Sequence, residues 1–139
     1  MRILIAEDDE AARWSMGQMV QEYGECEKVT DGEKAVEAFR MAWHENRPYD
    51  LILMDIMMPR MDGQAALERI REIERSQGIA DVEEVKAIMV TALEDPKSVV
   101  QAFYQGGASS YLVKPIEKEK LQEELGKLGF FPENSRELK

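Results

Sequence analysis

The chain has 139 residues, of which 44% are hydrophobic and 33% are charged, and its formal net charge is −10 at pH 7. These values indicate one folded domain that buries a core without disulfide or metal staples, and they exclude a disordered chain. The negative charge disfavours direct binding to nucleic acid or to anionic lipid, because phosphate groups would be repelled.

The first half of the chain alternates strand-like and helix-like segments. Arg2–Ala6 is apolar and predicts a strand, and apolar residues at helical spacing follow it until Gly24. Glu25–Val29 is short and charged, which is typical of an edge strand. Asp31 is then expected to cap a helix whose apolar positions continue to Trp43.

The second half continues the alternation. Asp50–Asp55 contains the unbroken apolar run LILM, as expected of a central strand that is covered on both faces. The remaining predicted elements are a helix over Gln64–Ser76, a strand over Val85–Thr91, a helix from Asp95-Pro96, a strand over Ser109–Val113 and a helix on Leu121, Leu125 and Leu128. We therefore predict a doubly wound (βα)5 α/β fold with a five-stranded parallel sheet and helices on both faces.

The same pattern predicts the domain organisation and the cellular compartment. Residues 1–128 are expected to form the domain, and residues 129–139 a short polar tail with no output domain. No apolar run approaches the roughly 20 residues that span a bilayer, and the amino terminus lacks the apolar region of a signal peptide. The single cysteine, Cys26, cannot form an internal disulfide. We therefore expect a cytoplasmic protein that does not enter a membrane.

Polar side chains follow four of the predicted strands. Asp8 and Asp9 follow ILIA, Asp55 follows LILM, Thr91 follows AIMV and Lys114 follows YLV. In open α/β sheets the binding crevice lies beyond the carboxyl ends of the strands. These residues are therefore expected to converge on one site.

The residue types indicate the chemistry of this site. Three neighbouring carboxylates repel one another unless a cation lies between them, and oxygen ligands favour Mg²⁺. Lys114 and Thr91 can hold phosphate oxygens, which suggests phosphoryl transfer. Asp55 is the candidate nucleophile, and Asp8 and Asp9 the candidate metal ligands. Taken alone, the position of Asp9 favours an N-cap of the first helix over a metal ligand.

Four motifs occur in the chain in this order: AEDD, LILMDIMMPRMDG, VTA and YLVKP. With these motifs the chain resembles the CheY-like receiver domain of two-component response regulators. The resemblance covers residues 1–128 and implies a flavodoxin-like sheet of strand order 2-1-3-4-5. It also implies that Asp55 accepts a phosphoryl group from a sensor histidine kinase or a phosphotransfer protein. Asp9 and Asp55 would then bind Mg²⁺ directly, Asp8 through water, and Met57 through its backbone carbonyl.

The resemblance assigns further roles near the phosphoryl group. Thr91 would bind one phosphoryl oxygen and Lys114 another, while the small Ala92 would leave access to the site. Tyr111 would turn inward with Thr91 and so change the surface presented to a downstream protein target, with the chain a monomer or a phosphorylation-dependent homodimer. The peptide bond before Pro115 would be cis.

Two alternatives to a phosphoacceptor remain open. A Mg²⁺-dependent phosphohydrolase of the haloacid-dehalogenase type would need an acid two residues after the nucleophile, where this chain has Met57. Met57 also replaces a polar residue found in many receivers, which leaves the dephosphorylation rate open. A receiver that does not accept phosphate would act as a constitutive docking module. Flavin binding is disfavoured because EDDE follows the first strand. We therefore expect a signalling protein that catalyses only its own phosphorylation and dephosphorylation.

Overall fold

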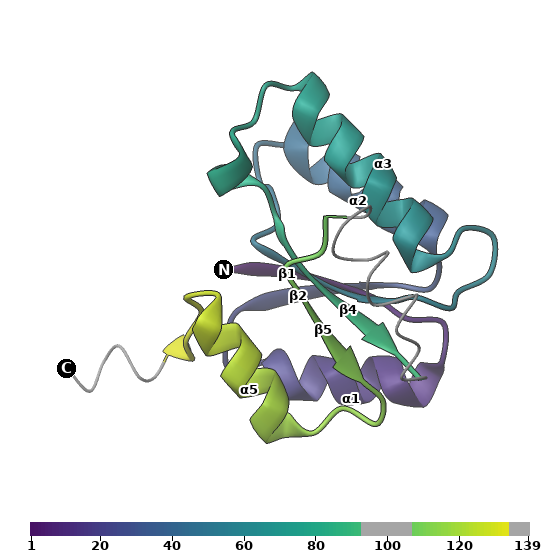
Figure 1. The fold of residues 1–139 in the computed structure, drawn as a ribbon, viewed down its shortest axis with the longest axis vertical. Helices are drawn as coiled ribbons and strands as arrows, with labels where there is room; N and C mark the ends of the chain where they lie inside the picture. Colours follow the sequence, from purple (N-terminus) through teal and green to yellow (C-terminus); the bar gives the residue numbers. More distant parts are fainter. Residues whose placement is uncertain (93–106, 134–139) are drawn as a thin grey trace.

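The computed structural model describes residues 1–92 and 107–133 (Figure 1). In chain order the elements are β1 (Arg2–Ala6), α1 (Glu10–Val20), β2 (Glu25–Val29), α2 (Gly32–His44), β3 (Leu51–Asp55), α3 (Gly63–Ser76), the 3-10 helix η1 (Asp81–Glu83), β4 (Lys86–Thr91), β5 (Ser110–Val113) and α5 (Lys118–Lys127). The helix predicted from Asp95-Pro96 lies outside the described residues. The predicted alternation is confirmed elsewhere, with strand bounds that differ by at most one residue.

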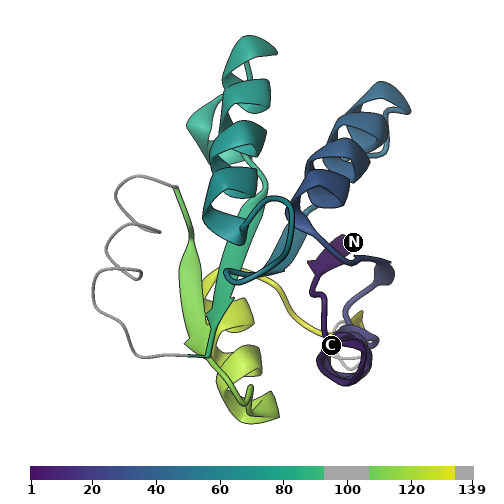
Figure 2. The same cartoon turned by 90° about the vertical axis from the view of Figure 1, so that its right-hand side faces the viewer.

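The five strands form one parallel sheet in the order β2-β1-β3-β4-β5, which confirms the predicted flavodoxin-like fold. Figure 2 shows α2 and α3 on one side of the sheet and α1 and α5 on the other. Each pair of helices covers its own hydrophobic cluster. The sheet is therefore the middle of three layers, and all its strands end at the same edge.

The central strand β3 shows why its sequence lacks polar alternation. All five of its residues are buried. Successive side chains point to opposite faces of a strand, so Ile52 and Met54 join the cluster under α2 and α3, while Leu51 and Leu53 join the cluster over α1 and α5. The charged strand β2, by contrast, lies at the edge of the sheet, where its exposed side chains face solvent.

Aspartates begin three of the helices at the carboxyl edge of the sheet. Asp9, Asp31 and Asp62 each accept a hydrogen bond of 2.8 Å from the backbone N–H three residues later. Each bond satisfies one of the amide groups that a helix leaves unpaired at its start. The loops that surround the site are therefore fixed at the point where each of these helices begins.

The first residues after α5 contact the rest of the domain in the part of the chain that the structure describes. Phe130 packs against the cluster shared by α1 and α5, and the Glu133 N–H donates to the Glu22 carbonyl oxygen at 2.9 Å. These contacts hold the chain after α5 against the domain as far as Glu133, where Phe131 is half exposed. Within the described ranges, no helix is long and apolar enough to cross a membrane.

Candidate functional site

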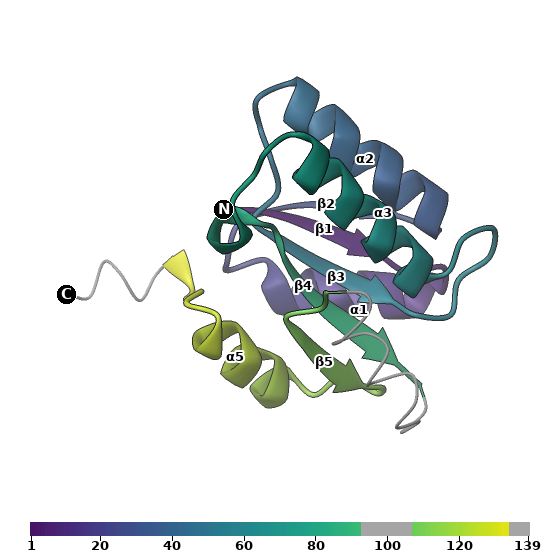
Figure 3. The same ribbon diagram turned by 45° about the horizontal axis from the view of Figure 1, so that its top comes forward.

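Three predicted site residues lie at the carboxyl edge of the sheet. Asp55 ends β3, Thr91 ends β4 and Lys114 directly follows β5. The backbone N–H of Lys114 donates to the Thr91 carbonyl oxygen at 2.7 Å, and the Asp55 and Thr91 side chains are almost fully buried. Figure 3 shows the arrowheads of β3, β4 and β5 reaching the same side of the molecule. The parallel topology therefore brings together residues that are far apart in the sequence.

The Lys114 side chain pairs with two carboxylates. Its Nζ lies 3.2 Å from Asp55 Oδ2 and 2.5 Å from Glu7 Oε1. Burial by itself would lower the pKa of Lys114, but the contacts with Glu7 and Asp55 outweigh burial and raise that pKa above its ordinary value. The ammonium group is therefore held in its charged form between Glu7 and Asp55.

Glu7 also lies in this site, although its place after β1 does not single it out in the sequence. It is fully buried, although it directly follows β1. The alternation of side chains along a strand could have indicated Glu7. Ile5 pairs with Leu53, and two residues further along these strands come Glu7 and Asp55, which therefore point to the same face of the sheet. A glutamate on the same face of the sheet as Asp55 can therefore be identified from the sequence once the register is known.

The acidic cluster consists of Glu7, Asp8 and Asp55, each with one carboxylate oxygen within 4.8 Å of the others. Asp9 has a different place, because its Oδ2 accepts from the Ala12 N–H at the start of α1. The backbone N–H of Asp9 in turn donates to Glu7 Oε2 at 3.1 Å. The structure thus places Glu7 and Asp8 next to Asp55, whereas Asp9, which the sequence analysis expects to bind the metal, caps α1.

The donor set of this cluster fits a divalent cation. Three carboxylates face one ammonium group, which leaves an excess of negative charge, and all the available ligand atoms are oxygens. The buried Glu7 Oε1 has no hydrogen bond of normal geometry among the described residues, although Lys114 Nζ pairs with it by charge. An oxygen atom of this kind can be a ligand of a hard metal ion. The residues present therefore fit Mg²⁺.

The other expected residues surround this centre. Met57 is 72% exposed in the loop after β3, and the peptide bond between Lys114 and Pro115 is cis. Tyr111 pairs in register with Met89, two residues before Thr91, so Tyr111 and Thr91 lie on the same face of the sheet. Tyr111 is 39% exposed there. The threonine and the tyrosine are therefore neighbours on one surface, although neither side chain belongs to the acidic cluster.

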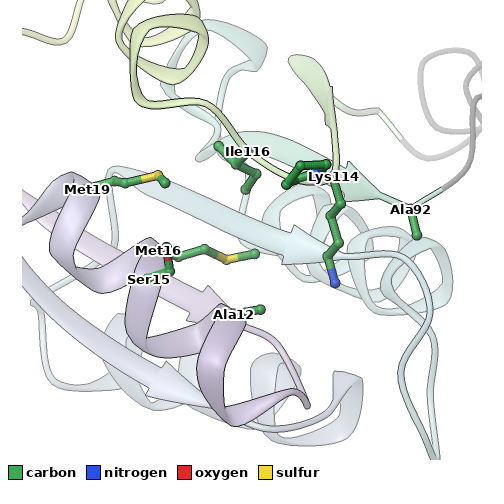
Figure 4. A pocket seen from close by; sticks show the side chains of 8 residues that line it. Ala12, Ser15, Met16, Met19, Ala92, Lys114 and Ile116 are labelled. Atoms are coloured by element: carbon green, nitrogen blue, oxygen red, sulfur yellow. The ribbon is translucent and has the colours of Figure 1, made fainter.

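A groove of about 340 Å³ opens beside the site (Figure 4). One wall is the α1 face that carries Ala12, Ser15, Met16 and Met19, and the other is formed by Ala92 and by Lys114, Pro115 and Ile116. The figure shows Lys114 extending from this wall toward the end of the sheet. The groove therefore offers a mostly apolar surface next to the buried carboxylates.

Gly63 packs closely against the backbone of Asp55, and replacing Gly63 by alanine tests this packing. A Cβ atom at Gly63 would lie 2.2 Å from the Asp55 carbonyl oxygen, so the strand end or the start of α3 must shift. We expect Gly63→Ala to lower the free energy of unfolding by about 1–3 kcal/mol, which urea denaturation can measure. Gly126→Ala is the matched control, because the new methyl group would be 3.8 Å from the nearest Phe131 atom. Equal stability of both variants would contradict this packing.

The fold and this site together define a parallel α/β domain whose acidic centre and lysine lie at the carboxyl edge of β3. Residues 3–126 match the response regulator receiver domain, and the chain belongs to this family. It is therefore a receiver domain of two-component signalling. It is 32% identical to the chemotaxis protein CheY of Bacillus subtilis over 91% of this chain and 95% of the relative.

The chain also matches a short part of a longer protein, and it shares its fold with a solved structure. The chain is 34% identical to a probable histidine kinase 2 of Oryza sativa subsp. indica, but it spans only 12% of that protein's length. It has the fold of a chain in the solved CheX-CheY-BeF3-Mg²⁺ complex from Borrelia burgdorferi, with a TM-score of 0.79, 24% identity and coverage of 93% of this chain and 89% of that one. Receiver domains of this fold thus occur both in small proteins and within large ones.

Proposed function

We propose that this domain accepts a phosphoryl group on Asp55 from a phosphohistidine of a sensor histidine kinase or a phosphotransfer protein. The observation that carries the proposal is the buried Asp55 carboxylate, which ends the central strand beside Lys114 and two further carboxylates. In the transfer, an Asp55 oxygen forms a bond to phosphorus while the P–N bond breaks, and the electron pair of that bond stays on the imidazole nitrogen. The partner would approach over the groove between α1 and Ile116, where apolar surface adjoins the site.

The residues around Asp55 would divide the work of binding the phosphoryl group. Lys114 would move from Glu7 to a phosphoryl oxygen, since both interactions need the same ammonium group, and the Thr91 hydroxyl would bind another oxygen. Glu7, Asp8 and Asp55, with the Met57 carbonyl, would hold Mg²⁺. When bound, this cation neutralises negative charge on the phosphoryl oxygens.

The signal would leave the site through the face that carries Thr91 and Tyr111. A phosphoryl group adds about −1.5 to −2 charges and new acceptor oxygens beside Thr91. Movement of the Thr91 hydroxyl toward this group would leave space for Tyr111, which lies on the same face, to turn inward. The altered surface would bind a downstream protein or a second copy of the chain. In this proposal the domain is a switch and not a turnover enzyme.

Intact-mass spectrometry tests the proposal directly. We expect incubation with acetyl phosphate and Mg²⁺ to add one phosphoryl group per chain, and removal of the metal with EDTA to abolish the addition. Asp55→Ala should gain none, because the attacking oxygen is missing. Asp62→Ala is a suitable control, since Asp62 caps α3 near the site and is not in the acidic cluster. An unmodified wild-type chain under these conditions would refute the proposal.

The same preparation separates the two remaining alternatives. Sustained release of many phosphates per chain from phosphate monoesters would favour a phosphohydrolase instead. Equal affinity of wild type and Asp55→Asn for a partner protein, with and without phosphodonor, would favour a constitutive docking module. The proposed switch requires neither result.

A further inference from the structure

A second groove, of about 280 Å³, lies at the amino ends of β3 and β4, opposite the edge that carries Asp55. Its walls come mainly from three segments that connect or follow the main elements. These are the chain from the end of α2 to β3, the η1 region and the chain after α5. Figure 3 shows η1 and the end of α5 on the side of the sheet where the amino terminus lies, while the strand arrows point away from it. A molecule in this groove would not touch the carboxyl edge.

The groove has apolar walls. Trp43, Tyr49 and Phe130 contribute aromatic rings, and Val82 and Val85 contribute aliphatic side chains. Val82 is 84% exposed in η1, so it offers its side chain to solvent beside these rings. A single exposed valine is ordinary, but one that adjoins an aromatic groove adds to a continuous apolar surface.

The rim of the groove is acidic. Asp50, Glu83 and Glu84 line it, with Lys86 as the basic lining residue. In the described part of the chain, the Glu83 and Glu84 carboxylates have neither an ion-pair nor a hydrogen-bond partner. Glu74 also lines the groove, but Arg71 and the Val85 N–H already bind its two oxygens. Two carboxylates beside an apolar surface are therefore free to bind a cationic group.

We infer that this groove binds a segment of a partner protein that inserts an apolar side chain between Trp43 and Phe130 and places lysine or arginine beside Glu83 and Glu84. Charge complementarity favours a basic segment, since the rim of the groove is acidic and the whole chain has a formal net charge of −10. In this groove, a second copy of the chain would bring its own excess of acidic side chains to an acidic rim, which disfavours it as the occupant. Because the groove is opposite Asp55, this partner would bind without regard to phosphorylation and could be held while another partner occupies the carboxyl edge.

Fluorescence of Trp43 provides the test, in a Trp14→Phe background that removes the other tryptophan, which is exposed on α1. The probe is a synthetic amphipathic peptide of leucine and lysine, and its control carries glutamate in place of each lysine. We expect a saturable change in Trp43 emission with the lysine peptide only. No saturable change, or an equal response to the glutamate peptide, would overturn the inference.

Variants separate the groove from the general acidity of the chain. Glu83→Lys with Glu84→Lys is expected to weaken binding of the lysine peptide about tenfold or more, because like charges would then meet at the rim. Glu33→Lys with Glu37→Lys, on the exposed side of α2, changes the net charge equally and should weaken binding much less. Equal losses of affinity in the two double variants would show that only net charge matters, and would overturn the inference that the peptide binds in this groove.

Two further measurements complete the test. Val82→Ser removes an exposed apolar contact without disturbing the core, so it should also weaken binding, and unchanged affinity would count against the apolar anchor. Addition of acetyl phosphate and Mg²⁺ should leave the affinity of the lysine peptide within about twofold. A larger change would contradict independence from the carboxyl edge. The peptide experiments without phosphodonor do not depend on whether Asp55 accepts phosphate, so the two proposals can fail separately.

Discussion

Replacing Glu74 by alanine is expected to lower the free energy of unfolding by about 3–5 kcal/mol. Glu74 is fully buried, and its Oε1 binds Arg71 Nη1 at 2.7 Å while its Oε2 accepts from the Val85 N–H at 2.7 Å. Arg71 is 6% exposed and also donates twice to the Gly107 carbonyl oxygen. The substitution would leave a buried guanidinium without its carboxylate and a buried N–H without an acceptor.

Urea denaturation followed by circular dichroism measures this loss. Glu72→Ala is the matched control in the same helix, because the pair between Glu72 and Arg69 is half exposed and should contribute about 0.5 kcal/mol or less. Glu74→Gln should lose less than Glu74→Ala, since its amide oxygen can still accept from the Val85 N–H. If Glu74→Ala were as stable as Glu72→Ala, the network that joins α3 to β4 and Gly107 would not hold the fold as we describe.

Replacing Lys114 by methionine is expected to make the stability of the domain depend strongly on Mg²⁺. In the absence of metal, Glu7 and Asp55 would both be buried without a cation, which should cost about 3 kcal/mol. A bound divalent ion would supply the missing charge. The stabilisation of the variant by Mg²⁺ should therefore exceed that of the wild type, since a ligand stabilises the folded state in proportion to the logarithm of its concentration over Kd.

Parallel urea titrations in EDTA and in Mg²⁺ check this result. Lys118→Met, which removes an exposed lysine at the start of α5, should show the wild-type response in both solutions. A Lys114→Met protein that is as stable as wild type in EDTA would contradict the pairing of Lys114 with Glu7 and Asp55. A smaller Mg²⁺ effect in the variant than in wild type would contradict a shared cation site.

Most of the fold could be predicted from the sequence because its local signals agree. The apolar runs at Arg2–Ala6 and Leu51–Asp55 lie between polar residues that end each strand, and Asp31 caps the following helix as expected. The strand order, however, came from the resemblance to receivers. Alternation of strands and helices determines a parallel sheet, but it does not determine which strands are neighbours.

The place of the site at the strand ends could be predicted, and the structure adds Glu7 to the residues that lie there. The two aspartates Asp8 and Asp9 are equally acidic in the sequence, and only the geometry separates the residue that faces Asp55 from the residue that caps α1. Glu7 was missed because a charged residue at a strand end is ordinarily expected in solvent. Its burial depends on Lys114, more than a hundred residues away in the chain, which supplies the opposite charge.

The buried pair of Arg71 and Glu74 could not be predicted for a similar reason. Both residues look like part of the polar face of α3 when the helix is taken alone. Their burial depends on the Val85 N–H and the Gly107 carbonyl oxygen, which come from distant segments that pack against α3 only in the folded chain. Periodicity reports the faces of one helix, whereas these contacts depend on tertiary packing.

Chemical mapping of the phosphorylated residue tests the central claim most directly. After incubation with acetyl phosphate and Mg²⁺, borohydride reduces an aspartyl phosphate to homoserine and releases phosphate, so the modified position can be found by peptide mass spectrometry. We expect homoserine at Asp55 alone, in amounts that fall when Mg²⁺ is removed with EDTA. Homoserine at Asp8 or at Asp9 with an unchanged Asp55 would contradict this claim.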